Sequence, residues 1–380
     1  MRPGADHDPE RGPPPRADLD STPAALSGIV AEIDLDLDRT IGAESERWSG
    51  EHPLLAEMLE ALSALVSDGK RLRAALCHWA FVGAGGEVPD PELTKLRTAV
   101  ELLHTFALLH DDVMDDASHR RGRTTLHHRF DAHHRNSEAK GEARRFGEGV
   151  AIIAGDLLHV MADRLMSELI ATPRPDSDGN GTSRLAHHWN ELRIEVNVGQ
   201  WLDLIGAAES TAGVDLADRI TELKSARYSA VRPLQLGAIL AQGDAAPLDE
   251  LARVGLPLGR SFQLRDDLLG VLGTPGEVGK PVGADLRSGK VTPLLIHARS
   301  ADLTTAQAAL LSRVGTAELE EVDIQQMVET LLAVGSVAAI EARIEALTHE
   351  ALAAIDASPL TPSSREKLGE IAIFAGRRTS

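Results

Sequence analysis

Apolar residues recur at steps of three and four along part of this chain, and that helical period is the feature that most constrains its fold. The repeat follows Pro91, and its members are Leu93, Leu96, Val100, Leu103 and Ala107. Such spacing places the side chains on one buried face of an α-helix. Sustained period-two alternation is missing, and aromatic residues make up only 3% of the chain, which disfavours strands. An all-α fold is therefore predicted.

The organisation of the chain is predicted from its polar and apolar stretches. Residues 1–22 are rich in Pro, Arg, Asp and Gly, which predicts a disordered tail. Helix-length apolar segments fill the rest without a shift in composition, so residues 23–380 are expected to form a single domain. Four polar stretches are predicted to be loops between helices: 131–147, 172–183, 242–247 and 273–289.

The formal net charge of −19 excludes nucleic acid as an expected partner, because such a chain repels phosphate backbones. The best apolar stretch, Leu331–Ile340, is interrupted by Gly335 and Ser336. It is far shorter than the roughly 20 residues that span a bilayer, so no membrane span is expected. The N-terminal residues also lack an apolar leader segment, which fits a cytoplasmic enzyme.

An aspartate-rich motif, Asp111-Asp112-Val113-Met114-Asp115, follows the apolar stretch LLHTFALLH. On a helix, Asp111 and Asp115 share a face because they are four residues apart. Crowded carboxylates repel one another, and hard divalent cations relieve that repulsion. Mg²⁺ takes one or two carboxylates and fills its other positions with water and substrate phosphate. A solvated acidic helix end is the alternative, which the apolar stretch before the motif disfavours.

Two basic clusters suggest sites for phosphorylated substrates. Arg120 and Arg121 come directly after the acidic motif, where guanidinium groups would grip a metal-bound diphosphate. Lys70 and Arg73 lie at the start of an apolar helix, where backbone N–H groups also favour anions. Two separate anion sites predict two phosphorylated substrates.

A second acidic motif, Asp266-Asp267-Leu268-Leu269-Gly270, lies far downstream. Other polar residues stand on the intervening and following segments, and each taken singly has a plain surface interpretation. They are Gln200, Asp203, Lys224, Tyr228, Lys280, Asp285, Arg287 and Lys290. The order of all these motifs along the chain, rather than any single residue, indicates a function.

In that order the motifs resemble those of the trans-isoprenyl diphosphate synthase (polyprenyl synthetase) family over residues 66–300. The matching segments are GKRLR (69–73), LLHDDVMDDASHRRGRTT (108–125), GD (155–156), GQWLDL (199–204), KSARYS (224–229), FQLRDDLLG (262–270), and GK followed by DLRSGK (285–290). The resemblance implies a large antiparallel helical bundle around a central cavity, assembled as a homodimer. It also implies a prenyltransferase that condenses isopentenyl diphosphate with an allylic diphosphate, using three Mg²⁺ ions per site and no protein nucleophile.

The resemblance implies roles for residues that match the family motifs. Catalytic roles fall on Asp111, Asp112, Asp115, Lys224 and Asp266, of which Asp111, Asp115 and Asp266 are the expected metal ligands. The allylic diphosphate is expected to meet Arg120, Lys224 and Lys280, with Gln263 nearby. Isopentenyl diphosphate is expected to meet Lys70, Arg73, His104 and Arg121.

Product length is expected to depend on the residue five before the first aspartate, Phe106, with the small Ala107 beside it. This pattern resembles that of geranylgeranyl (twenty-carbon) synthases. On an ideal helix, five residues also turn the side chain by roughly 140° from Asp111, so the assignment rests on the resemblance. A farnesyl or longer-chain synthase remains an alternative.

The chain departs from the family pattern where Gly270 replaces the last aspartate of the second motif, which puts metal affinity in doubt. That departure keeps a non-catalytic subunit of a heteromeric synthase as an alternative function. A class I terpene cyclase is a further alternative, because such enzymes also use an aspartate-rich helix. The cyclase is disfavoured because Asn136-Ser137-Glu138 lies in a predicted loop at the wrong spacing and aromatic residues are scarce.

Overall fold

The structure is a computed structural model that describes residues 22–67, 69–137, 139–172, 180–209, 213–273, 283–316 and 319–378. Almost all of these residues lie in helices, which confirms the all-α prediction. The predicted N-terminal tail lies outside the described residues apart from Thr22. The prediction of a single domain stays a prediction.

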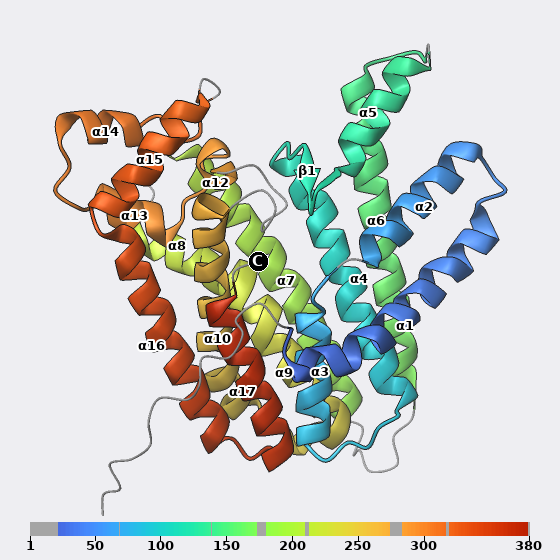
Figure 1. Ribbon diagram of the computed structural model, residues 1–380. Coiled ribbons are helices and arrows are strands. Elements are labelled where there is room, and N and C mark those ends of the chain that lie inside the picture. Colours follow the sequence, from blue (N-terminus) through green and yellow to red (C-terminus); the bar gives the residue numbers. More distant parts are fainter. Residues whose placement is uncertain are drawn as a thin grey trace, which may run out of the picture.

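Long helices packed side by side form the body of the molecule (Figure 1). The first half of the chain supplies α1 (Ala24–Trp48), α2 (Pro53–Val66), α3 (Leu72–Gly83), α4 (Pro91–Met114), α5 (Leu126–Asn136), α6 (Ala143–Ala171) and α7 (Asn180–Ala208). The second half supplies α8 (Val214–Ile220), the π-helix η1 (Thr221–Val231), α9 (Arg232–Gln242), the short 3₁₀ turn η2 (Gly243–Ala245), α10 (Leu248–Leu272), α12 (Ala284–Arg287), α13 (Pro293–Arg299), α14 (Thr305–Leu311), α15 (Glu321–Ala333), α16 (Ser336–Ala357) and α17 (Pro362–Arg377).

Helix α4 begins where the sequence predicted. Pro91 occupies its first turn, where a missing N–H costs nothing, and the Asp90 side chain accepts hydrogen bonds from the N–H groups of Glu92 and Leu93. Leu93, Leu96 and the other periodic apolar residues up to Leu103 are buried. The helix ends at Met114, so the first acidic motif forms its last turn.

A tight hairpin follows α4 and directs Arg120 and Arg121 toward different neighbours. Strands β1 (His119–Arg120) and β2 (Arg123–Thr124) pair antiparallel, with Arg120 opposite Arg123. The connecting residues, Arg121 and Gly122, both have positive φ angles, of 51° and 73°. Two-residue hairpin turns of this kind need φ above zero at both positions, which glycine adopts without strain.

Helix occupies part of three predicted loops: α7 begins at Asn180 inside 172–183, α12 (Ala284–Arg287) lies inside 273–289, and 131–147 is mostly helical. The stretch 131–147 was expected to be a loop, but α5 continues to Asn136 and α6 begins at Ala143, which leaves a short connection. The polar residues of this stretch predicted a loop, but a contact between residues at its edges stabilises helices there. Phe130 of α5 packs against Phe146 of α6, with ring centroids 6.5 Å apart. Within the described residues, no helix is both long and apolar enough to cross a membrane.

The helices that carry the predicted motifs pack directly on one another. Helix α4 lies against α6 and α3, and η1 lies against both α7 and α10. Gly199 of α7 allows a very close approach to η1, since a Cβ there would lie 2.4 Å from the Lys224 backbone nitrogen. The main core is built from α1–α7, η1, α9, α10, α16 and α17, and a second cluster lies among α10 and α12–α16.

Candidate active site

The first acidic motif faces the basic residues of several other segments. Asp111 Oδ1 accepts hydrogen bonds from Lys224 Nζ of η1 at 3.0 Å and from Gln200 Nε2 of α7 at 3.3 Å. Its other oxygen lies 3.0 Å from Arg120 Nη2. Burial alone would raise the pKa of Asp111, but Lys224, Lys290 and Arg120 outweigh it and hold the pKa well below its usual range. Asp111 therefore stays ionised.

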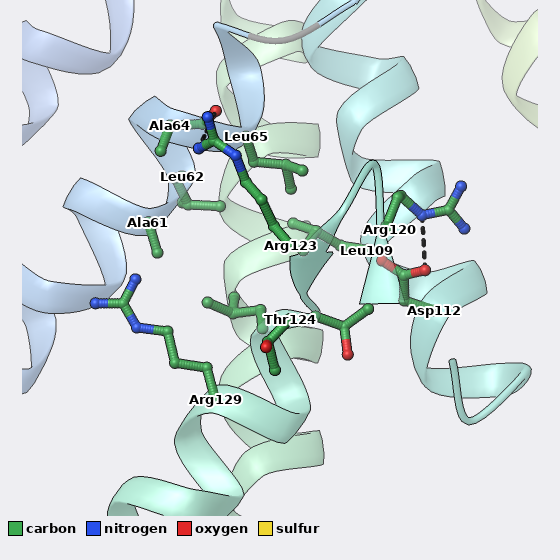
Figure 2. A pocket seen from close by; sticks show the side chains of 12 residues that line it. Ala61, Leu62, Ala64, Leu65, Leu109, Asp112, Arg120, Arg123, Thr124 and Arg129 are labelled. Atoms are coloured by element: carbon green, nitrogen blue, oxygen red, sulfur yellow. Dashed lines mark hydrogen bonds and ion pairs between the residues drawn. The ribbon is translucent and has the colours of Figure 1, made fainter. Parts of the chain in front are cut away.

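Asp112 is buried and shares Arg120 with Asp111. Its Oδ1 accepts a hydrogen bond from Arg120 Nε at 2.6 Å. Figure 2 shows the pair at the edge of a cavity of about 260 Å³, which α2 lines with apolar side chains that include Leu62 and Leu65. Since Arg120 bridges Asp111 and Asp112, the second aspartate fixes the guanidinium that faces the first.

Lys290 lies at the centre of the carboxylates. Its Nζ is 2.9 Å from Asp115 Oδ2, the third aspartate of the first motif. Burial alone would lower the pKa of Lys290, but Asp111, Asp285, Asp115 and Asp203 together raise it well above its usual value. The same lysine lowers the pKa of Asp267 in the second motif. Lys290 therefore pairs with the first acidic motif and acts electrostatically on the second.

The second motif lies on α10, and its two aspartates have different surroundings. Asp267 is buried, and its Oδ1 accepts a hydrogen bond from Gln263 Nε2 at 2.7 Å. Burial, reinforced by Asp285, raises the pKa of Asp267 to about 7. Asp266 is more exposed and pairs with Arg378, just after α17. Figure 1 shows α17 running into the middle of the bundle, beside α10.

A second cationic group lies at the start of α3. The Arg73 guanidinium stands 4.7 Å over the ring of Tyr228 and donates to Ser229 Oγ at 2.6 Å. The Tyr228 hydroxyl is 3.2 Å from His104 Nδ1. Burial lowers the pKa of His104 well below its usual value, and Arg73 and Arg121 lower it further. His104 is therefore neutral.

Lys70 completes that cationic group. Burial lowers the pKa of Lys70 to about 8, and the charges of Arg378 and Arg121 add to the shift. Arg121 also approaches Gly69, where a Cβ would lie 3.4 Å from its Nη1. The hairpin turn thus sends Arg121 toward Lys70 while Arg120 faces the acidic motif. The predicted residues Lys70, Arg73, His104 and Arg121 form one cluster.

Phe106 packs on the side of α4 that faces α6. Its ring stacks on His159 at 4.8 Å between centroids and meets the edge of His110 at 4.6 Å. Gly155 of α6 leaves room for the His110 ring, since a Cβ there would lie 2.4 Å from His110 Cδ2. Ala107 is half-buried against the main core. Asp111 and Phe106 therefore face different neighbours, as the helical rotation between them requires.

The structure adds residues to the site that the sequence predicted. It does not describe one of the predicted site residues. Lys280 lies outside the described residues. Five additions are Gln200, Asp203, Asp285, Lys290 and Arg378. Four of them stand in or near motifs that the sequence already singled out. No sequence motif pointed to Arg378, because it lies far from the acidic motifs along the chain and beside another basic residue, Arg377.

The family follows from a comparison with known proteins. A family model described as polyprenyl synthetase matches residues 53–331. The chain belongs to this family. It is 36% identical over 250 residues to a geranylgeranyl diphosphate synthase from Mycobacterium tuberculosis, covering 65% of this chain and 64% of the relative. A geranylgeranyl diphosphate synthase from Saccharolobus solfataricus is 32% identical, covering 70% of this chain and 73% of the relative.

A solved structure agrees with this family assignment. A geranylgeranyl pyrophosphate synthase from Corynebacterium glutamicum, in complex with isoprenyl diphosphate and magnesium, superposes with a TM-score of 0.86 at 31% identity. The alignment covers 93% of this chain and 99% of that one. In the present chain, the carboxylates of Asp111, Asp115 and Asp266 are hard oxygen donors, which are the ligands that Mg²⁺ prefers. The donor set at the site therefore fits magnesium.

Proposed function

We propose that this polyprenyl synthetase condenses isopentenyl diphosphate with an allylic diphosphate and releases geranylgeranyl diphosphate as its main product. The carrying observation is the pairing of the first acidic motif with three cations: Lys224 and Arg120 each lie 3.0 Å from Asp111, and Lys290 lies 2.9 Å from Asp115. Lys290 also lowers the pKa of Asp267 in the second motif. Metal-binding carboxylates interleaved with fixed cations suit a leaving diphosphate. A product of another length, farnesyl or longer, is the alternative that the test below separates.

The residues have the following proposed roles. Asp111, Asp115 and Asp266 hold the magnesium ions, three per site, and when bound these ions neutralise charge on the departing diphosphate. Arg120 and Lys224 grip the allylic diphosphate, with Gln263 nearby and Lys280 assigned on the resemblance alone. Asp112 and Asp203 position these cations, since Asp112 lies 2.6 Å from Arg120 Nε and Asp203 lies 2.5 Å from Lys224 Nζ.

Lys70, Arg73, His104 and Arg121 are proposed to bind the diphosphate of isopentenyl diphosphate. As the allylic carbon–oxygen bond breaks, the double bond of the second substrate attacks the allylic carbon and forms the new carbon–carbon bond. A proton then leaves the adduct for the released diphosphate. The protein supplies position, charge and exclusion of water, and no side chain forms a bond to substrate.

We also propose that the protein works as a homodimer through α6 and α7, which pack side by side. Ile153 and Val160 of α6 are 64% and 63% exposed and stand seven residues apart. Ile194 and Trp201 of α7 have the same spacing and are 56% and 59% exposed. Exposed apolar side chains that share a face on adjacent helices favour burial in an interface. The cytoplasmic location stays a prediction from the sequence.

The test incubates the purified protein with Mg²⁺, isopentenyl diphosphate and allylic primers of five, ten or fifteen carbons. Chromatography of the products is expected to show a twenty-carbon chain from each accepted primer. If the products end at fifteen carbons, the protein is a farnesyl diphosphate synthase. If they continue well past twenty carbons, it is a longer-chain synthase. If no primer yields diphosphate, the chain is a non-catalytic subunit.

A further inference from the structure

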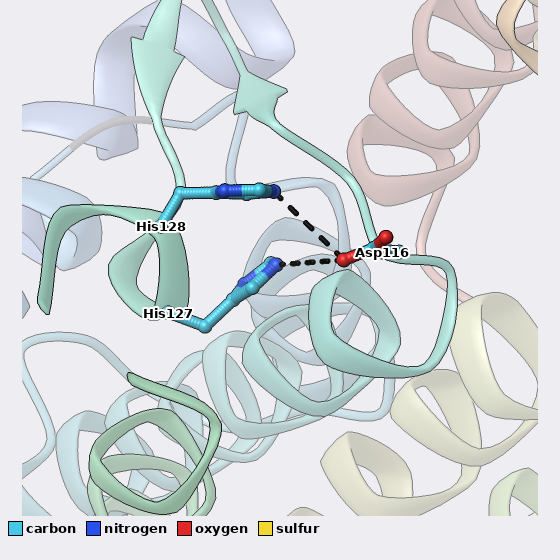
Figure 3. A group of neighbouring side chains, drawn as sticks. All are labelled: Asp116, His127 and His128. Atoms are coloured by element: carbon cyan, nitrogen blue, oxygen red, sulfur yellow. Dashed lines mark ion pairs between the residues drawn. The ribbon is translucent and has the colours of Figure 1, made fainter. Parts of the chain in front are cut away.

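A group of three side chains just beyond the first acidic motif has no role in the reaction described above. Asp116 follows the last turn of α4, and His127 and His128 lie in the first turn of α5. Figure 3 shows both imidazole rings directed at the Asp116 carboxylate. His127 Nε2 and His128 Nε2 lie 3.8 Å and 3.9 Å from Asp116 Oδ1. One donor atom from each residue lies within 4.8 Å of the other two.

The two histidines lack the hydrogen bonds that buried imidazoles normally make. His127 is 4% exposed, and within the described residues neither of its ring nitrogens has a hydrogen-bond partner. Nε2 of His128 is also buried without a partner. The separations from Asp116 are too long for hydrogen bonds. Buried polar atoms left in this way are costly and point to a missing water or ion.

We propose that Asp116, His127 and His128 bind a divalent transition-metal ion of the Zn²⁺ type, separate from the catalytic magnesium. Two imidazoles and one carboxylate form a three-ligand set that leaves a fourth position for water. Ligands 2.0–2.1 Å from a tetrahedral zinc stand roughly 3.3 Å apart. The two separations between histidine and aspartate, 3.8 and 3.9 Å, therefore need a closure of about 0.5 Å, and the two histidine nitrogens, which lie within 4.8 Å of each other, need a closure of at most about 1.5 Å. Imidazole nitrogen also selects zinc-like ions over magnesium.

The surroundings of the group are compatible with a bound cation. Burial lowers the pKa of His127, and the neighbouring His128 lowers it further, so the ring is neutral as a metal ligand must be. Arg144 Nη2 lies 3.7 Å from Asp116 Oδ1, but its Nε donates a hydrogen bond to Glu148 Oε1 at 2.8 Å, so Glu148 shares the charge of this arginine with Asp116. Such an ion would join the end of α4 to α5 on either side of the arginine hairpin.

The proposal is tested on the full-length protein, freed of metal with a chelator and held in saturating Mg²⁺. Titration with Co²⁺, followed by visible absorption, reports tetrahedral or five-coordinate binding, and Zn²⁺ competition measures affinity. We expect one Co²⁺ per chain, displaced by Zn²⁺. Asp116→Asn and His128→Ala should each weaken binding by at least about tenfold. Asparagine tolerates the positive φ of 49° at residue 116, and His128 lies partly at the surface, so both variants should keep the fold.

Two control variants separate this site from others. His187→Ala alters another adjacent histidine pair, His187 and His188, and should leave the Co²⁺ spectrum unchanged. Asp111→Asn alters the magnesium motif and should also leave it unchanged. The proposal is overturned if the wild-type protein shows no Co²⁺ band, or if the band survives in both Asp116→Asn and His128→Ala. Circular dichroism of each variant confirms its fold.

Discussion

Asp285 directs its carboxylate at the α-carbon of Gly270, where a Cβ would lie 2.2 Å from Asp285 Oδ2. Gly270 is the position at which the second acidic motif has lost its last aspartate. The carboxylate missing from the sequence of α10 is therefore supplied in space by the residue that opens the segment DLRSGK. A carboxylate is therefore still present beside the shortened motif. Its presence weakens the case for a non-catalytic subunit.

Restoring the aspartate should harm the enzyme. Gly270→Asp would drive a side chain into Asp285 and add like charge, and overpacking of this kind costs about 1–3 kcal/mol. We expect kcat to fall and the magnesium concentration at half-maximal activity to change in steady-state assays. Gly149→Ala is the matched control, because a Cβ there meets open space. Higher activity in Gly270→Asp would show that Asp285 moves aside.

Asp111 is expected to be the most sensitive carboxylate. Asp111→Asn keeps the shape but removes the charge that pairs with Lys224 and Arg120, and it removes a proposed metal ligand. Loss of a charge-stabilising group of this kind costs about 10²–10³-fold in kcat. Chelation of Mg²⁺ in the wild-type protein should abolish activity. Asp302→Asn, at an exposed aspartate between α13 and α14, should behave as wild type, and equal activity in both variants would refute the assignment.

Phe106→Ala is expected to lengthen the product. Removing the ring leaves space between α4 and α6, next to His159, into which a growing chain can extend. Truncating a buried phenylalanine also costs about 3–5 kcal/mol of stability, so the control must match that loss. Phe130→Ala removes a more deeply buried ring on α5, 1% exposed against 9% for Phe106. Chromatography should show longer chains for Phe106→Ala alone, and unchanged products would disprove this role.

Binding of isopentenyl diphosphate should weaken as pH rises through about 8. Burial lowers the pKa of Lys70 to about 8, so the free enzyme loses this positive charge above that pH. A neutral amine attracts diphosphate less, and kcat/KM for isopentenyl diphosphate, which reports the free enzyme, should fall on the alkaline side. In Lys70→Arg the charge persists, and the alkaline fall should disappear. An identical pH profile in that variant would exclude Lys70 as the cause.

A charge placed on the exposed face of α6 should break the proposed dimer. Ile153→Glu would leave an ionised group in a desolvated interface, which strongly opposes association. Sedimentation should report a dimer for the wild-type protein and a monomer for Ile153→Glu. Leu35→Glu on α1, at a similarly exposed leucine, is the control and should stay dimeric. A monomeric wild-type protein would contradict the proposal directly.

The sequence by itself determined the helical class, the start of α4 at Pro91 and the residues of both acidic motifs. These features follow from local rules, because a helical period and a proline at the first turn act within a few residues of one another. Local polarity predicted a loop over 131–147, where the packing of Phe130 on Phe146 holds two helices together.

Only the tertiary structure decided which charges meet. Lys290 stands among carboxylates from several segments, Asp285 fills the space beside Gly270, and Arg378 reaches Asp266 from the end of the chain. The separation of Arg120 from Arg121 likewise depends on two positive φ angles at one turn. Electrostatic partners depend on distance in space, and no local pattern encodes a distance between residues more than a hundred positions apart.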